Sequence, residues 1–264
     1  MYSDIHTEGE SKVNARVLLL DIETSPITAH VWGLRDQNVG LNQIRQHPRV
    51  IGIGAKWLGS NHVMWKSEYH HSRTEMLEWI NSLLDQCDIA SHFNGAGFDI
   101  PWLIGEFAKE DLAPPSPFKN IDLYRVARRS FRLASYKLAY VSSHLGLGHK
   151  VDTGGHDLWV RCLEGEGDDQ RKAWALMRRY CKQDVALLEP LFHKLKPYFP
   201  GTVNMAVYGT ESMACQKCGS TDLESRGTAY TAQRAYPQFR CNDCGGWTRD
   251  SKSSWSINTV GVTR

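Results

Sequence analysis

Apolar residues form a regular pattern only after a polar first segment. Residues 1–15 show no apolar repeat, so we expect a flexible N-terminus there. The continuous apolar run at 16–21 predicts a buried strand. Two further apolar segments, 50–57 and 62–65, are separated by a turn-like Leu-Gly-Ser-Asn and predict a hairpin. Three antiparallel strands are therefore expected early in the chain.

Helical periodicity dominates the middle of the chain. Apolar positions recur at helical spacing after Ser72, and Glu75 completes a capping box with it. Residues 88–92 predict one more strand, and a helix is expected after Asp99. The remaining helices are expected around 122–132, 136–146, 169–181 and 184–196. The pattern predicts an α/β fold, with a mixed β-sheet flanked by helices.

The composition changes beyond residue 200, where Gly, Ser, Thr, Cys and Arg become frequent and apolar periodicity fades. We therefore expect the α/β domain to occupy residues 16–200, followed by a linker at 201–211 and a small module at 212–264. A chain of 264 residues, 41% of them hydrophobic, can bury one substantial core and carry such a module.

Charge and hydropathy exclude some classes of protein. The net charge of +2 is too small to indicate a nucleic-acid partner by itself. No segment approaches the roughly 20 apolar residues that cross a bilayer, and the first residues lack the features of a signal peptide. We expect no membrane partner and a cytoplasmic location.

Two acidic residues lie at the end of the first predicted strand. Asp21 and Glu23 are two positions apart, so both side chains point to the same side of the sheet. Adjacent buried carboxylates need compensating charge, and hard cations such as Mg²⁺ supply it through oxygen ligands. The alternative is a strand-end Asp that caps a turn.

Two more carboxylates follow later in the chain. Asp99 ends an N-x(3)-F-D motif after the strand at 88–92, where a simple N-cap is the alternative. Tyr180 and Asp184 are four positions apart, which places the phenol and the carboxylate on one helix face. Each feature alone is common, whereas the ordered set D-x-E, N-x(3)-F-D and Y-x(3)-D is specific.

In this order the motifs resemble those of the DEDDy 3′-to-5′ exonucleases, especially predicted exonucleases similar to the proofreading domain of family B DNA polymerases. Supporting matches are Leu20-Asp21-Ile22-Glu23-Thr24, Phe98-Asp99-Ile100-Pro101, Ser135-Tyr136-Lys137-Leu138 and Tyr180-Cys181-Lys182-Gln183-Asp184-Val185. The resemblance covers residues 16–197. It implies a ribonuclease H-like fold and hydrolysis of single-stranded nucleic acid from its 3′ end, with DNA favoured over RNA.

The resemblance also implies two Mg²⁺ or Mn²⁺ ions, which stabilise the attacking and leaving oxygens of an in-line displacement. Asp21 would bridge both ions, and Glu23 and Asp184 would complete the shell of the first. Asp99 would serve the second ion. Tyr180 would orient the attacking water, because an ordinary phenol is a poor base at neutral pH.

Other residues are expected to hold the substrate. By the resemblance, Asn94 and Phe98 shape the pocket around the terminal nucleotide, and core packing is the alternative for Phe98. Four arginines at helical spacing predict a basic stripe that guides phosphates, with a solvated helix face as the alternative. They are Arg125, Arg128, Arg129 and Arg132.

Four of the seven cysteines form two C-x-x-C pairs, Cys215 with Cys218 and Cys241 with Cys244. This spacing predicts a zinc ribbon with one structural Zn²⁺, because four thiolates leave no ligand position open for catalysis. Disulfides are the alternative, disfavoured because a C-x-x-C loop is small. Interleaved basic and aromatic residues favour nucleic-acid contact by this module, and docking to a replication or repair protein is the other possibility.

Three functional hypotheses result. The first is a metal-dependent 3′-to-5′ exonuclease acting on single-stranded DNA. The second is an exoribonuclease or a hydrolase of short oligonucleotides. The third is a nucleic-acid-binding adaptor without catalysis, which the intact set of carboxylates argues against.

Overall fold

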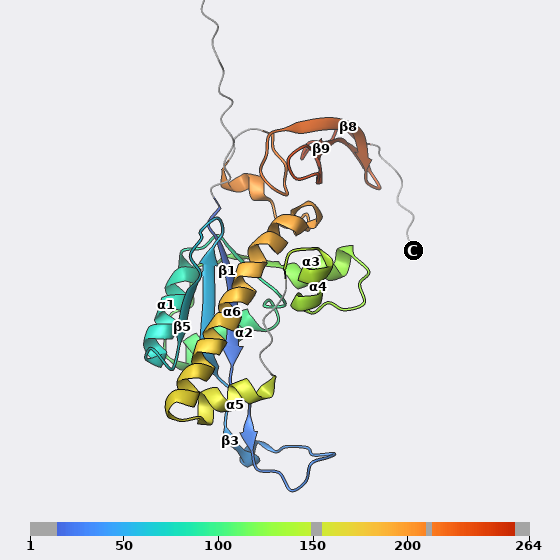
Figure 1. Cartoon of the computed structure of the whole chain (residues 1–264). Helices are drawn as coiled ribbons and strands as arrows, with labels where there is room; N and C mark the ends of the chain where they lie inside the picture. Colours follow the sequence, from blue (N-terminus) through green and yellow to red (C-terminus); the bar gives the residue numbers. More distant parts are fainter. Residues whose placement is uncertain (1–14, 149–154, 210–212, 257–264) are drawn as a thin grey trace, which may run out of the picture. The chain divides into compact units, whose positions relative to one another are not determined.

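The computed structural model describes residues 15–148, 155–209 and 213–256. They belong to two compact units, of which one is Arg16–His193 and the other contains the residues from Lys194 onward (Figure 1). The predicted flexible N-terminus lies almost entirely outside the described residues. The domain and linker boundaries drawn from composition stay a prediction.

A five-stranded mixed sheet forms the centre of the first unit. Its strands are β1 (Val17–Thr24), β4 (Val50–Trp57), β5 (Met64–Ser67), β6 (Ile89–His92) and β7 (Lys119–Asp122), in the order β5-β4-β1-β6-β7. β1 pairs antiparallel with β4, and β4 with β5, which confirms the three early antiparallel strands. β6 is parallel to β1, and β7 is parallel to β6. The predicted mixed α/β fold is confirmed.

The helices of this unit are α1 (Arg73–Asp85), α2 (Asp99–Lys109), α3 (Leu123–Ser130), α4 (Leu138–His144), α5 (His156–Glu164) and α6 (Gly167–Leu195). The predicted capping box is present at the start of α1. The Glu75 amide donates to the Ser72 hydroxyl at 3.2 Å, and the Ser72 amide donates to the Glu75 carboxylate at 2.8 Å. These bonds satisfy amides that the helix leaves unpaired.

Alternation along β1 separates the apolar core from the acidic side chains. Leu18, Leu20 and Ile22 pack in one buried cluster with residues of α1 and α2. Asp21 and Glu23 therefore point to the opposite face, as period-two geometry requires. That face is covered by α5 and α6, whose buried residues form a second cluster with Ile51 of β4.

Several elements differ from the sequence prediction. One 29-residue helix, α6, replaces the two helices expected at 169–181 and 184–196, because Lys182 and Gln183 do not break a helix. The α5 helix was not predicted. Strand β7 was missed because its residues Lys119 and Asn120 are exposed and carry no apolar alternation. The strands β2 (Thr28–Ala29) and β3 (Ile44–Gln46) were missed as well.

The second unit contains a small antiparallel sheet. Strand β9 (Arg234–Cys241) pairs with β8 (Leu223–Tyr230), β10 (Trp247–Arg249) and β11 (Trp255–Ser256). Two short 3₁₀ turns, Lys196–Tyr198 and Met205–Tyr208, precede the sheet in the chain.

Helices long and apolar enough to span a bilayer do not occur among the described residues.

Gly54 of β4 sets how closely α6 approaches the sheet. It pairs with Asp21 of β1. A Cβ atom at this position would lie 2.9 Å from Cys181 Sγ and 2.9 Å from Val185 Cγ2, both on α6. Such distances are shorter than carbon atoms tolerate, so only glycine permits this spacing.

We predict that Gly54→Ala lowers the free energy of unfolding by about 1–3 kcal/mol, because the added methyl group must displace α6. The matched control is Gly105→Ala at an exposed position of α2, where a Cβ meets nothing within 4 Å. That change should raise stability by about 0.5–1 kcal/mol. Urea denaturation of both variants measures the difference, and unchanged stability of Gly54→Ala would contradict the close packing.

Candidate active site

Asp21 and Glu23 meet α6 on the acidic face of β1. One ligand atom each of Asp21, Glu23 and Cys181 lies within 4.8 Å of the other two. The Cys181 sulfur is 3.8 Å from Asp21 Oδ2. Asp21 stands inside β1, which continues to Thr24, so the alternative of a strand-end turn cap is wrong. Sequence reasoning missed Cys181, because only the packing of α6 on the sheet brings it here.

Asp99 reaches back from the first turn of α2 to the same strand. Its Oδ1 accepts a hydrogen bond from the Ile22 amide at 3.0 Å, between the two β1 carboxylates in sequence. Pairing of β1 with β6 ends at Leu19, so this amide lies beyond that pairing. Phe98 is the N-cap residue of α2, and the alternative of Asp99 as a simple N-cap is therefore wrong.

Burial changes the protonation of Asp99. The side chain is 4% exposed, and desolvation raises the pKa of its carboxyl group to about 7. The negative charge of Asp122 raises the pKa as well, whereas the hydrogen bond from the Ile22 amide opposes the rise. A cation beside Asp99 would favour the ionised form.

Asp184 supplies the fourth carboxylate from α6, where it is 3% exposed. Burial raises the pKa of the Cys181 thiol well above its ordinary value, and the charges of Asp21, Glu23 and Asp184 raise it further. Three of the four predicted carboxylates are thus close enough to the buried Cys181 thiol to raise its pKa. The thiol stays protonated, so the charged oxygen atoms are the better ligands for a hard cation.

A loop that is held by a hydrogen bond to Asp122 connects β6 to Asp99. Asn94 has a left-handed φ of +70°, and its amide donates to Asp122 Oδ1 at 2.9 Å. A Cβ on Gly95 would lie 2.7 Å from Asp99 Oδ2, so the carboxylate needs glycine here. Asp122 also accepts the Tyr124 amide at 3.1 Å. Sequence reasoning missed Asp122, because its role depends on β7 lying beside β6.

A cavity of about 340 Å³ lies beside Glu23. Its walls include Phe98 and two residues of the unpredicted helix α5, His156 and Trp159. The Trp159 indole donates to the Thr24 carbonyl at 3.1 Å. The half-buried Tyr180 ring meets Trp159 edge-on, with 6.3 Å between the ring centres. Buried Leu158 and Cys162, at i and i+4, are the sequence signal that could have located α5.

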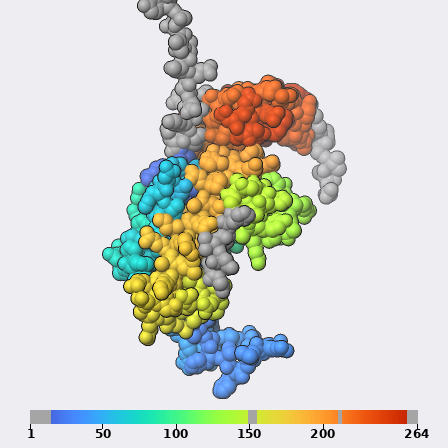
Figure 2. All heavy atoms as spheres, viewed as in Figure 1, coloured from blue at the N-terminus to red at the C-terminus, as the bar shows by residue number. Residues whose placement is uncertain are grey.

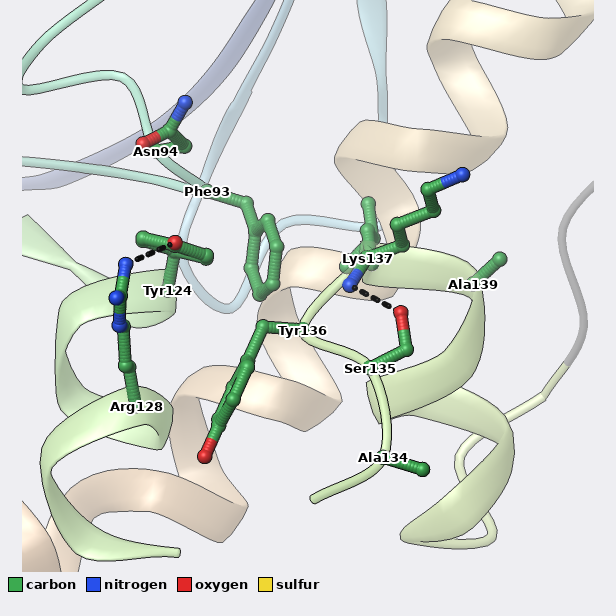
Figure 3. Close-up of a pocket in the computed structure, with 10 residues that line it drawn as sticks. Phe93, Asn94, Tyr124, Arg128, Ala134, Ser135, Tyr136, Lys137 and Ala139 are labelled. Atoms are coloured by element: carbon green, nitrogen blue, oxygen red, sulfur yellow. Dashed lines mark hydrogen bonds between the residues drawn. The ribbon is translucent and has the colours of Figure 1, made fainter. Parts of the chain in front are cut away.

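Phe98 is 40% exposed, so core packing does not explain it. A larger cavity of about 780 Å³ lies nearby, and Figure 3 shows the side chains of Asn94, Tyr124, Arg128 and Tyr136 around it. The Arg128 guanidinium donates to the Tyr124 hydroxyl at 2.8 Å. The structure thus places two of the predicted substrate residues, Asn94 and Arg128, in one cavity.

The predicted stripe of four arginines on one helix is wrong in part. Arg125, Arg128 and Arg129 are exposed on α3, but the helix ends at Ser130 and leaves Arg132 outside. The cause is the extended backbone of Phe131, which is the C-cap residue. Arg125 forms an ion pair with Asp122, with 3.4 Å between Nε and Oδ2.

Comparison with known proteins identifies the family. A model of the RNase H superfamily matches residues 38–196, which is more than half of the chain. The chain belongs to the RNase H superfamily. The matched range includes Asp99, Tyr180 and Asp184, whereas Asp21 and Glu23 precede it. The predicted ribonuclease H-like fold is thereby confirmed.

Two DNA polymerases are similar to this RNase H superfamily member. The DNA polymerase 120R of Invertebrate iridescent virus 3 is 40% identical over 158 residues, and the match covers 46% of this chain and 14% of the viral protein. The structure of a family B DNA polymerase from Pyrobaculum calidifontis matches with 14% identity and a TM-score of 0.49, covering 83% of this chain and 31% of that one. The chain therefore spans less than a third of the length of either polymerase.

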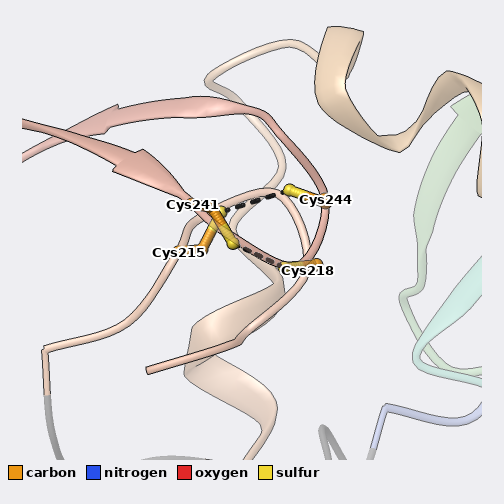
Figure 4. A group of neighbouring side chains, drawn as sticks. All are labelled: Cys215, Cys218, Cys241 and Cys244. Atoms are coloured by element: carbon orange, nitrogen blue, oxygen red, sulfur yellow. Dashed lines mark hydrogen bonds between the residues drawn. The ribbon is translucent and has the colours of Figure 1, made fainter. Parts of the chain in front are cut away.

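Four cysteines near the C-terminal end of the chain form a second cluster, which suits Zn²⁺ and not a hard cation such as Mg²⁺. The sulfur atoms of Cys215, Cys218, Cys241 and Cys244 offer four ligands within 4.8 Å of one another (Figure 4). Cys215 and Cys244 are 3.7 Å apart, and Cys218 and Cys241 are 3.5 Å apart. A tetrahedron with Zn–S bonds of about 2.3 Å has edges of about 3.8 Å. The distances fit zinc and are too long for a disulfide of about 2 Å.

Backbone geometry supports the cysteine cluster. The residue after each C-x-x-C pair is a glycine with positive φ, +81° at Gly219 and +71° at Gly245. The amides of Lys217 and Gly246 each donate to a cysteine sulfur at 3.4 Å. Amides that point at sulfur stabilise thiolates, which is the form that binds a metal.

We predict that, without added divalent cations, stability falls as pH rises through about 7. Folding raises the pKa of Asp99 from 3.8 to about 7, so the folded state binds more protons between these values. The stabilisation is present at low pH and is lost as Asp99 ionises. Asp99→Asn keeps an acceptor for the Ile22 amide and should show a flatter profile.

Melting temperatures between about pH 5 and pH 8 test this prediction. Mg²⁺ should restore stability to the unmutated protein at the upper end, because a ligand of the folded state stabilises it. A parallel decline in both proteins would show that Asp99 is not the group responsible.

We predict one zinc ion per chain, lost in Cys215→Ser and Cys241→Ser, because the site needs all four thiolates. Elemental analysis of the purified proteins measures the zinc. The exposed neighbour Asp243 provides the control, since Asp243→Ala leaves every sulfur in place. Full zinc content in the cysteine variants would contradict the assignment.

Proposed function

We propose that this chain is a metal-dependent 3′-to-5′ exonuclease of single-stranded nucleic acid, with DNA as the favoured substrate. The observation that carries the proposal is the gathering of acidic residues from distant parts of the sequence. Asp21 and Glu23 come from β1, Asp184 comes from α6, and Asp99 is fixed to β1 through Ile22. Such burial of like charges is costly unless cations compensate it.

The donor set supports two Mg²⁺ or Mn²⁺ ions held by Asp21, Glu23, Asp99 and Asp184. The ions would supply Lewis acidity and a hydroxide at neutral pH. The chain itself keeps the oxygen donors in place, because the Ile22 amide holds Asp99 and Gly54 lets α6 bring Asp184 to the sheet.

Tyr180 is the candidate for holding the attacking water. Its hydroxyl is carried by a ring that packs edge-on against Trp159, and Trp159 is fixed by its bond to the Thr24 carbonyl. A phenol in this position can donate to and accept from a water molecule without losing its own proton. Positioning, not proton abstraction, is therefore its proposed role.

The exposed residues beside the acidic cluster are suited to bind single-stranded nucleic acid. Phe98 borders the cavity at Glu23 and offers a face on which the terminal base can stack. Asn94 lines the larger cavity with Arg128, which with Arg125 and Arg129 can contact phosphates. Arg132, outside the helix but exposed, remains a candidate for the same role. The viral relative described as a DNA polymerase supports DNA as the substrate.

The zinc-binding module is proposed to contribute a second contact. Tyr230 is 72% exposed and Trp247 is 49% exposed on its sheet. The guanidinium of the exposed Arg249 lies on the same sheet, 3.8 Å from the centre of the buried Tyr236 ring. Exposed aromatic and cationic groups together favour single-stranded nucleic acid. A replication or repair protein is the alternative partner.

We predict that Asp21→Asn lowers kcat/KM by on the order of 10³-fold or more, about 4 kcal/mol of transition-state stabilisation, because it removes a metal-binding charge. Tyr180→Phe should cost about tenfold, since only positioning is lost. The assay follows a 5′-labelled single-stranded DNA with Mg²⁺ or Mn²⁺, beside RNA of the same sequence.

A ladder that shortens from the 3′ end and disappears in Asp21→Asn is the expected result. Faster loss of the RNA would favour the exoribonuclease. Binding of both polymers without cleavage by the unmutated protein would favour the adaptor and overturn the proposal.

A further inference from the structure

A narrow arm follows directly after the acidic strand. We use the term arm for residues 27–47, in which β2 and β3 pair antiparallel and the segment between them forms the tip. Figure 1 shows the arm below α5, and in Figure 2 its blue atoms project from the rest of the first unit. The proposed exonuclease chemistry does not use it.

Apolar side chains on the arm face solvent. Trp32 is 98% exposed, Leu34 is 100% exposed and Leu41 is 83% exposed. Ile27, Val31 and Val39 also count among the exposed apolar residues. Apolar groups that gather outside any core mark a contact with another molecule.

Polar bonds, not apolar packing, hold the arm together. The His30 amide donates to the Gln43 carbonyl at 3.0 Å, and Gln43 Nε2 donates to the His30 carbonyl at 2.9 Å. At the base, the Ser25 amide donates to the Arg49 carbonyl at 2.8 Å, and the Arg49 amide donates to the Ser25 hydroxyl at 3.0 Å. The exposed apolar side chains are therefore not needed to form the arm.

Both ends of the arm border the candidate active site. Residues 24–26, which immediately precede the arm, line the cavity beside Glu23. At the other end, His47 lines a third cavity, of about 560 Å³, with Phe98 and Trp102. A polymer whose end occupies the cavity at Glu23 therefore lies beside the base of the arm.

The charge of the arm indicates the class of molecule that it contacts. Arg35 and Arg45 are exposed, and Asp36 is the single acidic residue between 27 and 47. A basic segment with an exposed aromatic ring suits a phosphate backbone and the face of a base.

We propose that the arm contacts the single-stranded substrate, with Trp32 stacked on a base upstream of the cleaved bond. The proposal rests on the proposed exonuclease function. Trp32 lies six positions after Pro26 at the cavity, a reach of at most ~22 Å. A stacked strand rises about 3.4 Å per nucleotide, so Trp32 meets a base within about six nucleotides of the cavity.

This placement makes the contribution of Trp32 depend on substrate length. Trp32→Ala should lower kcat/KM for a DNA of about twelve nucleotides by about tenfold, the worth of one stacked base, through a higher KM. A dinucleotide offers a single base-to-base step of about 3.4 Å, well short of the extended arm, so its kcat/KM should change by less than about twofold. Because the Trp32 side chain is 98% exposed, its removal should leave the melting temperature unchanged, which is measured alongside.

Binding without cleavage provides a second readout. In the Asp21→Asn background, fluorescence anisotropy of a labelled twelve-residue oligodeoxythymidylate should show about tenfold weaker binding with Trp32→Ala. Trp32→Phe keeps an aromatic face and should bind nearly normally, whereas Trp32→Leu keeps only apolar area and should bind as weakly as Trp32→Ala. Ile104→Ala, an exposed apolar site on α2, is the matched control and should have no effect.

Three results would overturn the inference while leaving the exonuclease in place. The first is that Trp32→Ala cleaves and binds long DNA as well as the unmutated chain does. The second is normal binding by Trp32→Leu, which would show apolar docking in place of base stacking. The third is self-association of the unmutated chain that Trp32→Ala abolishes in sedimentation experiments, which would identify a second copy as the occupant. Absence of cleavage by the unmutated chain would instead contradict the proposed function.

Discussion

The burial of several carboxylates in one place is the constraint on which the structure depends. Like charges repel and desolvation penalises each of them, so the surrounding fold must hold them where they would not gather by themselves. Close packing of α6 at Gly54 brings Cys181 against Asp21, and the Ile22 amide fixes Asp99 beside the same strand. The rigid apolar cluster behind β1 provides the support for both contacts.

The acidic residues and the residues suited to bind a polymer lie on different elements of the first unit. The acidic residues stand on a strand and on helices, where the backbone fixes their positions. The residues suited to a polymer are exposed on α3 and on the arm, with Phe98 at the edge of the cavity beside Glu23. This arrangement suits the proposed exonuclease, in which one fixed acidic cluster would cleave a polymer that the exposed residues hold. The C-terminal unit has its own sheet and its own cysteine cluster.

Membership of the RNase H superfamily gives the acidic cluster a chemical context, and the roles of single residues remain proposals. The viral polymerase is far longer than this chain, which covers 14% of it, so its full activity does not transfer to this chain. The structure adds features that motifs do not carry. Cys181 lies among the carboxylates, Asp122 fixes the loop before Asp99, and Trp159 packs against Tyr180.

The sequence by itself determined the early strands, the capped helix α1, the four acidic positions and the paired cysteines. These features follow from local periodicity or from fixed spacing, which the chain carries at every point. Tertiary structure decided that β7 joins the sheet beside β6. It also placed Cys181 beside Asp21 and left Trp32 exposed. Contacts between segments far apart in sequence decide these outcomes, and no local pattern encodes them.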